Sequence, residues 1–297
     1  PSLDLGGSAG RSGQWDQPST ESFRGSLQAG YEVDLWGANA AGVSGAEADL
    51  LARQYDFVAL DLVLQGDVTA AYLQILAFDA RLAVARRNLE AARDILGLVQ
   101  LQYDAGAVSG LDLAQQRQQV ASIEAQIPVL EGNRRLTENA LALLLGLTPD
   151  QLPPIRGAFD ALQQPQVAPG LPAALLARRP DVLAAEAALV SANADIGQAR
   201  AAFYPSLSLT ADGGLASAAL SAFLRPDSLL YSLAASLTAP LFDGGQREAN
   251  LELTEARKAE LVESYRQAAL TAYREVEDAL IGQQTAALQM EALRRSA

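Results

Sequence analysis

The chain has 297 residues, of which 22 are basic and 35 acidic, giving a formal net charge of -13, and it contains neither cysteine nor histidine. The lack of both excludes thiol nucleophiles, disulfides, imidazole catalysis and Cys/His metal sites. The acidic balance argues against nucleic acid as a partner. Apolar residues reach 49% while aromatic residues reach only 6%, which favours long helices rich in alanine and leucine over a thick globular core.

Four segments alternate between apolar and polar residues. In residues 23–35 the odd positions are apolar or small and the even positions are polar, and residues 205–212 and 229–241 alternate in the same way. Residues 2–9 are a weaker copy of the pattern. A period of two is the signature of a β-strand. The alternation therefore predicts two hairpins, with loops near 10–22 and 214–228.

The strand pattern favours a membrane wall over a soluble sandwich, because only four strands accompany very long helical segments. We expect the odd-numbered side chains to face lipid and the even ones to face a polar lumen. Four strands cannot close a barrel, since about eight is the smallest single-chain size, so several chains must share one. Four aromatic residues near strand ends fit positions at the membrane–water interface: Trp36, Phe203, Tyr204 and Phe242. Ordinary packing is a sufficient explanation for each of them taken singly.

Helical sequence fills most of the remaining chain. Between 37 and 103 there is no proline, and apolar residues recur every seven positions. They are Ile75, Leu82, Leu89, Leu96 and Tyr103. This spacing predicts a coiled-coil seam that reverses at a glycine-containing tip and returns along residues 111–146. Pro128 lies within the return helix, where we expect a kink or local unwinding.

No helix is expected to span the membrane. The uncharged stretch at residues 228–242 is about 15 residues long and is shorter than the ~18 residues that a span requires. Acidic residues at 275, 277 and 278 are best explained as a solvated helical face. The glycines at 106, 110, 244 and 245 do not form phosphate loops, because no buried strand and no lysine accompany them. We expect no catalytic residue, metal site or cofactor.

The chain also repeats itself, since residues 1–5 match 205–209, and Leu35-Trp36 matches Leu241-Phe242. The repeating unit is a hairpin, a long helix and a return helix. We expect six parts: a first β-hairpin at 1–36, a long helical hairpin at 37–146 with its tip at 104–112, a connector at 147–179, a return helix at 180–204, a second β-hairpin at 205–242, and a second long helix at 243–297 that is cut before its tip. One finished helical hairpin and one unpaired helix should result.

Five segments, taken together, resemble TolC/OprM-type outer-membrane efflux proteins, and most closely the lipoprotein branch that serves resistance–nodulation–division pumps. They are Tyr103-x-x-Gly106-x-x-Ser109-x-Leu111-Asp112, Arg179-Pro180-Asp181-Val182, Ile196-Gly197 through Tyr204-Pro205-Ser206-Leu207, Pro240-Leu241-Phe242-Asp243-Gly244-Gly245, and Arg274-Glu275-Val276-Glu277-Asp278. The departures from the family pattern are truncations: the lipid-bearing N-terminal cysteine, the first helical pair and the second tip are absent from this sequence.

The resemblance implies a mainly α fold with a small β part. Three chains would each contribute four strands to one shared transmembrane β-barrel. A periplasmic α-helical barrel with an equatorial connector would continue it. It also implies a passive exit duct for drugs, metals or other small toxic compounds in the outer membrane of a Gram-negative bacterium. A periplasmic membrane-fusion adaptor and an inner-membrane pump would be its partners.

The resemblance further assigns roles at the tip. Tyr103, Gly106, Ser109 and Leu111 would contact the adaptor, and Asp112 would hold the periplasmic gate closed. The favourable place of a carboxylate in the first turn of a helix is by itself a sufficient structural reason for Asp112. Two other functions stay open: a type I secretion exit duct, and a non-channel periplasmic coiled-coil adaptor. An enzyme ranks last.

Overall fold

The computed structural model describes residues 1–297 apart from 14, 17–18, 163–176 and 297. The chain divides into two compact units, Pro1–Asp56 with Leu171–Ala297, and Phe57–Gly170. Long helices account for most of the described residues, and four strands form one sheet. The expected fold class, mainly α with a small β part, is confirmed.

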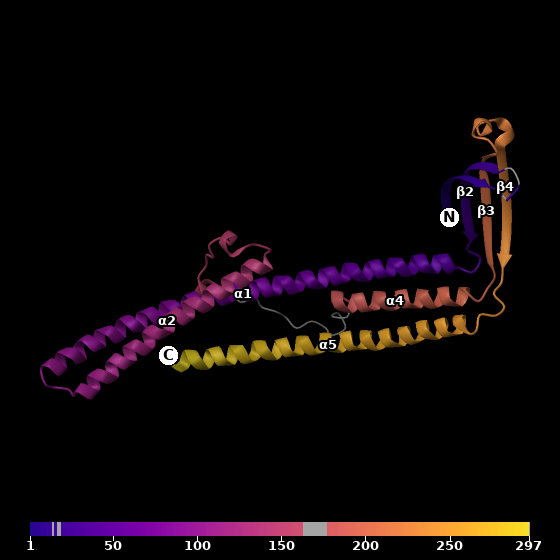
Figure 1. Ribbon diagram of the computed structural model, residues 1–297. Coiled ribbons are helices and arrows are strands. Elements are labelled where there is room, and N and C mark those ends of the chain that lie inside the picture. Colours follow the sequence, from indigo (N-terminus) through magenta and orange to yellow (C-terminus); the bar gives the residue numbers. More distant parts are fainter. Residues whose placement is uncertain (14, 17–18, 163–176, 297) are drawn as a thin grey trace. The chain divides into compact units, whose positions relative to one another are not determined.

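The sheet belongs to the first unit and is antiparallel, in the order β1 (Ser2–Ser12), β2 (Thr20–Val33), β3 (Ser206–Ser217) and β4 (Leu229–Thr238) (Figure 1). Odd residues pair with odd residues in every ladder, as in Leu5 with Leu27, Tyr31 with Leu209, and Ala211 with Leu233. Because side chains of paired residues lie on the same face of a sheet, all four strands share one apolar face and one polar face.

The pairing of β2 with β3 joins the two hairpins, and the alternation of single segments did not reveal it. Strand β3 also continues past the expected end at 212, through Gly213 and Gly214 to Ser217. A Cβ atom at Gly214 would collide with the backbone of Gly25 and Ser26. The close approach of the two strands therefore requires glycine at a position where glycine weakens the sequence signal for a strand.

Three helical segments complete the first unit: the start of α1 (Ala38–Asp104), α4 (Pro180–Ala201) and α5 (Gln246–Ser296). Small residues allow α4 to lie close to α1, since a Cβ at Gly45 would lie 3.4 Å from the Cβ of Ala194. Helix α4 also runs along α5 (Figure 1) and buries Val182 completely. Over its described length α5 is one helix without a reversal, as expected, and its seam residue Leu288 is 61% exposed.

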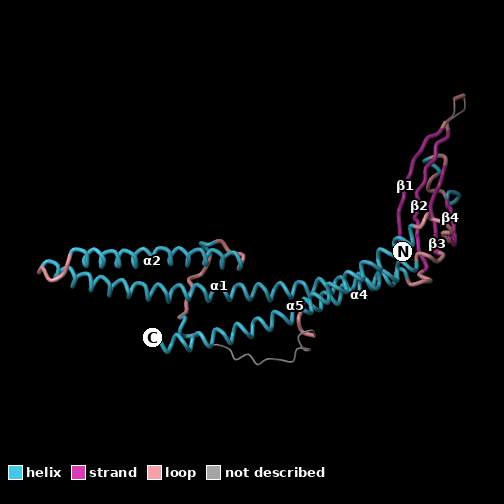
Figure 2. Tube along the Cα trace, turned by 90° about the horizontal axis from the view of Figure 1, so that it is seen from below, coloured by secondary structure: helices cyan, strands magenta, loops and turns pink. Residues whose placement is uncertain are grey.

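The second unit contains the rest of α1 and the antiparallel helix α2 (Gly110–Leu144) (Figure 2). Leu89, Ala92 and Val120 form the centre of the seam, with Leu96, Ile123 and Ile127 packed against them. This is the heptad seam that the spacing predicts. Helix α2 is continuous through the exposed Pro128, so the local unwinding expected there is not observed.

One part of α1 corrects the expectation that no helix is apolar enough to cross a membrane. An 18-residue window in this helix has a mean hydropathy of 1.4 and is 28% buried. The expectation considered only uncharged stretches, whereas this window combines at most two charged residues with many apolar ones. Length and composition are the whole of this evidence, and a single such helix is weak evidence for a span.

Candidate functional site

The polar face of the sheet carries most of the charge on its strands. Asp4, Gln28, Asp212 and Ser232 stand opposite one another in a single row across the four strands. Arg24 and Asp212 line the same hollow of about 270 Å³ on this face. Burying a row of carboxylate, amide and hydroxyl groups costs free energy unless each group is paired, whereas water satisfies them directly, so this face is suited to line an aqueous channel.

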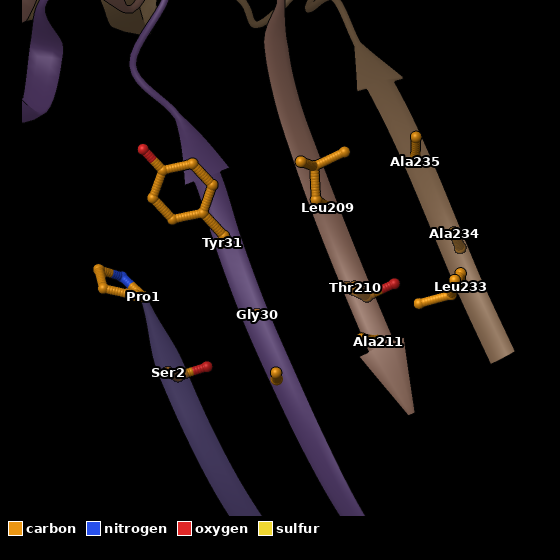
Figure 3. Close-up of a pocket in the computed structure, with 11 residues that line it drawn as sticks. Pro1, Ser2, Gly30, Tyr31, Leu209, Thr210, Ala211, Leu233, Ala234 and Ala235 are labelled. Atoms are coloured by element: carbon orange, nitrogen blue, oxygen red, sulfur yellow. The ribbon is translucent and has the colours of Figure 1, made fainter. Parts of the chain in front are cut away.

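The opposite face of the sheet is apolar and carries a shallow groove of about 570 Å³. Figure 3 shows the strands that form it. The side chains of two neighbouring rows form its walls: Tyr31, Leu209 and Ala235 in one row, and Ala29, Ala211 and Leu233 in the other. Leu233 is 79% exposed and Leu5 is 86% exposed. Such a continuous bare apolar face indicates contact with lipid or with another protein.

The helical tip is a tight reversal built from two capping motifs. At the end of α1, the amide of Ala107 donates to the carbonyl of Gln102 (2.8 Å) and the amide of Gly106 donates to that of Tyr103 (2.9 Å). Gly106 has φ +72°. This is a Schellman motif, which requires a left-handed residue at the position of Gly106.

At the start of α2, Ser109 and Asp112 form a capping box. The carboxylate Oδ2 of Asp112 accepts hydrogen bonds from the hydroxyl (2.7 Å) and the amide (2.9 Å) of Ser109. Both bonds favour the charged form, and the hydroxyl, acting most strongly, holds the pKa of Asp112 below its ordinary value. The structural explanation for Asp112 is thus supported by geometry, while no hydrogen bond or ion pair from the described residues engages its second oxygen, Oδ1.

The structure brings the expected adaptor-contact residues to one end of the helical hairpin. Ser109 and Gly106 shape the turn, whereas Leu111 is 66% exposed and Tyr103 is 43% exposed. The ring of Tyr103 lies beside Gly110, since a Cβ on that glycine would be 3.6 Å from Cε2 of Tyr103. The tip therefore presents one aromatic and one aliphatic side chain on a rigid turn.

The expected interfacial aromatics lie where strands give way to helices, but their surroundings differ. Trp36 stacks on Tyr204 with ring centroids 4.6 Å apart, and its indole N–H donates to the carbonyl of Pro205 (2.8 Å). Phe203 lies under the guanidinium of Arg247, 5.6 Å from the ring centre. Phe242 is 91% exposed. Packing between segments thus explains the first three, and only Phe242 is left bare.

Aspartates begin the helix that follows each β-hairpin. Asp34 accepts from the amides of Asn39 (3.2 Å) and Ala40 (2.8 Å) ahead of α1, and Asp243 accepts from the amides of Gly245 and Arg247 (both 3.1 Å) ahead of α5. Gly244 and Gly245 both have positive φ. The Gly-Gly pair at 244 and 245 therefore serves a sharp strand-to-helix turn that most other residues would strain.

Sequence reasoning missed the ion pair that joins two of the segments on which the family resemblance rests. Nη2 of Arg179 donates both to Asp181 Oδ2 and to Glu275 Oε2, each at 2.7 Å. The two carboxylates raise the pKa of Arg179. Glu275 was assigned to a solvated helical face, and its contact is 96 positions away along the chain. No local pattern could have revealed this link between the start of α4 and α5.

A polar ladder along the helical hairpin was also missed, although its signal is in the sequence. Four residues of α1, spaced by seven positions, each form a side-chain hydrogen bond with a residue of α2: Asp79, Arg86, Arg93 and Gln100. The partners are Arg134, Glu131, Glu124 and Arg117, at distances of 2.6 to 2.8 Å. Such pairs flank a coiled-coil seam and fix its register.

Comparison with known proteins identifies this architecture. The sequence pattern described as "Outer membrane efflux protein" matches residues 1–147 and 171–297. The chain belongs to the outer membrane efflux protein family. This assignment places it in the outer membrane of Gram-negative bacteria, with the helices extending into the periplasm. Among the described residues, no group of three or more Asp or Glu side chains is placed to hold a metal ion.

Relatives within the outer membrane efflux protein family differ in the cargo that their names give. The chain is 41% identical to the pyoverdine export outer membrane protein OpmQ of Pseudomonas putida, over 90% of this chain and 57% of that protein. It is 33% identical to the cation efflux system protein CusC of Escherichia coli, over 99% of this chain and 65% of that protein. The chain thus spans little more than half the length of OpmQ.

Solved structures of outer membrane efflux proteins share the fold. A crystal structure of CusC superposes with a TM-score of 0.91 at 32% identity, covering 99% of this chain and 69% of that one. The open state of the MtrE outer membrane channel of Neisseria gonorrhoeae gives a TM-score of 0.90 at 28% identity, covering 99% of this chain and 67% of that one.

Proposed function

We propose that the protein is the outer-membrane exit duct of a tripartite efflux system, passively conducting small toxic compounds from the periplasm to the exterior. The observation that carries this proposal is the register of the sheet, which gives four strands one apolar face and one polar face. That division is what a membrane channel wall requires, because one side must meet lipid and the other water.

The oligomer follows from the edges of the sheet. Strands β1 and β4 each have one unpaired edge in the part of the chain that the structure describes. Exposed edges are costly in an apolar environment, because backbone N–H and C=O groups must find partners there. Pairing β1 of one chain with β4 of the next would satisfy both edges, and three chains would close a barrel of 12 strands.

The cargo class rests on the relatives. Their names give pyoverdine, cations and toluene as cargo, and these are chemically unlike compounds. A duct that selects little by itself and accepts what its pump delivers accounts for this range. We assign this chain drugs, metals or other small toxic compounds, delivered through a periplasmic adaptor and an inner-membrane pump.

At the helical tip, Tyr103, Gly106, Ser109 and Leu111 are the proposed adaptor contacts. The exposure of Leu111 and Tyr103 on a rigid turn supports this assignment. Asp112 is the proposed gate residue, because its Oδ1 bonds no group in the described part of the chain while Oδ2 caps the helix. In a closed oligomer the free oxygen would bond groups on neighbouring tips. Trp36, Phe203, Tyr204 and Phe242 are the proposed interfacial aromatics.

Two alternatives use the same fold differently. A type I secretion exit duct would share the channel but pass polypeptides, and it would be distinguished by its cargo. A non-channel coiled-coil adaptor would need the helical hairpins but not the two-faced sheet. The sheet therefore favours a channel.

Reconstitution of the full-length protein tests the proposal. In a planar bilayer it should give stable conductance, in detergent it should run as a trimer, and in a strain lacking its own efflux duct it should restore resistance to small toxic compounds. A compact monomer that gives no conductance would overturn the channel. Conductance with export of a polypeptide alone would favour the secretion duct instead.

A further inference from the structure

The loop between β3 and β4, residues 218–228, has a compact and internally bonded structure. It contains two 3₁₀ turns, Leu220–Ala222 and Pro226–Ser228. The hydroxyl of Ser228, a residue only 6% exposed, donates to the carbonyl of Ala222 (2.7 Å). The amides of Phe223, Arg225 and Ser228 also bond within the loop. Its backbone is thus held in a defined conformation.

This loop folds over the apolar face of the sheet. A Cβ atom on Gly25 would lie 3.1 Å from Cζ of Phe223, so the phenyl ring covers the notch that this glycine leaves. Gly25 is an odd residue, paired with Gly7 and Leu215, and odd side chains point to the apolar face. The hollow on the polar face is lined by strand residues instead.

The loop also contacts a part of the sheet where the odd-numbered face is still apolar. Along the first hairpin, the apolar face ends where Arg11 and Glu21 stand opposite each other on the odd side. Gly25 is four residues further into β2, which is about 13 Å along the strand. Phe223 therefore rests well inside the level at which the neighbouring hairpin first carries charge.

Two leucines project from this loop. Leu224 is 84% exposed and Leu220 is 67% exposed, whereas loops that face water are mostly polar. The charges within the loop are Arg225, which follows Leu224 directly, and Asp227, two positions further on. The loop bonds part of its own backbone, and its remaining peptide groups can reach water or lipid headgroups at the edge of the membrane, so its leucine side chains can enter lipid without burying unpaired backbone in the hydrocarbon.

We propose that the loop 218–228 is a membrane-inserted segment, with Leu220 and Leu224 among the acyl chains of the lipid that surrounds the loop end of the barrel and Arg225 at the level of the headgroups. This inference rests on the proposed function for the position of the sheet in the membrane. The occupant is argued from continuity, since the loop extends the face that β1 to β4 turn toward lipid.

Because the chain has no cysteine, single cysteines can report on the loop. In the full-length protein in phospholipid vesicles, Leu224→Cys and Leu220→Cys would each carry a polarity-sensitive dye. Leu233→Cys on the apolar face and Ser232→Cys on the polar face serve as references. Quenching by phospholipids brominated on their acyl chains, and by iodide in the water, is then measured for each.

We expect the dyes at 224 and 220 to match the 233 reference, with a blue-shifted emission and strong quenching by brominated lipid. If the dye at 224 and the dye at 220 both behave like the 232 reference, the proposed insertion is overturned. Shielding from both quenchers would overturn it too, because the loop would then pack against a neighbouring chain. If the 233 reference itself is not quenched by lipid, the position of the sheet fails, and with it the proposed channel.

Discussion

The two roles of Asp112, capping of α2 and gating, can be tested separately, because Ser109 takes part in the capping alone. The pair caps α2 through Oδ2 of Asp112, while gating would use the free Oδ1. We expect Asp112→Ala to raise the conductance or leak of the full-length protein in a bilayer, and Ser109→Ala to loosen the cap without that rise. If both variants conduct like the parent, or both leak equally, the capping role stands alone.

The pKa of Asp112 gives a prediction about pH. Its folded-state pKa lies below the ordinary value of 3.8 because of the bonds from Ser109. A carboxyl of this kind stabilises the folded tip at neutral pH, and its contribution is lost as the pH falls through the lowered pKa. The amide signal of Ser109, followed by NMR, should therefore stay unchanged down to about pH 4 and shift only below it. A shift near pH 6 would contradict the bonding.

Gly106 and Gly132 form a matched pair of glycines in the helical hairpin. Both have open space around the position of a Cβ, but only Gly106 has a positive φ. A side chain at Gly106 should cost about 1 kcal/mol or more, while Gly132→Ala should stabilise its helix by about 0.5–1 kcal/mol. We expect Gly106→Leu to abolish efflux with trimer assembly retained. Normal efflux by the Gly106→Leu variant would contradict the assignment of the tip to adaptor binding.

At the scale of the elements, the two faces of the sheet predict opposite effects for adjacent residues. Leu233 lies on the apolar face and Ser232 on the polar face of β4. Leu233→Lys should destabilise the barrel by roughly 2–4 kcal/mol, whereas Ser232→Lys should be tolerated. Urea titrations of folding into lipid vesicles measure both. Equal stability of the two variants would contradict the assignment of the faces.

The single elements were predictable from the sequence because their signals are local. Alternation in residues 23–35 and the heptads through Leu82 and Leu89 depend only on near neighbours along the chain. The glycines at 213 and 214 hid the end of β3, and the role of Gly214 depends on the backbone of β2. At the site, the tip turn was predictable from Gly106, and the capping box has a local Ser109-x-x-Asp112 signature that the sequence analysis overlooked, whereas the stack of Trp36 on Tyr204 appeared only with the fold.

At the scale of the first unit, the ion pair of Arg179 and Glu275 ties α4 to α5. Arg179 is 25% exposed and Glu275 is 48% exposed, so the pair is only partly screened by water. Glu275→Gln should lower the free energy of unfolding by about 1 kcal/mol, and Arg179→Met by more, because Asp181 then loses its partner as well. Asp278→Asn is the control, as its contact to Arg274 is exposed and 3.9 Å long. Denaturant titrations in detergent should separate the three variants.

The joining of β2 to β3 bears on the order in which the chain can fold. Trp36 and Pro205, at the base of these strands, are 169 positions apart, whereas each hairpin closes over a short loop. Closing so long a loop is slow and entropically unfavourable unless helices first shorten the path. The hairpins can therefore form early, but the sheet must wait until the helical segments between them have turned back. Until then, two strand edges with bare leucines are open to wrong pairing. Until its helices have formed, a nascent chain of this protein is therefore exposed to strand pairing with its own copies.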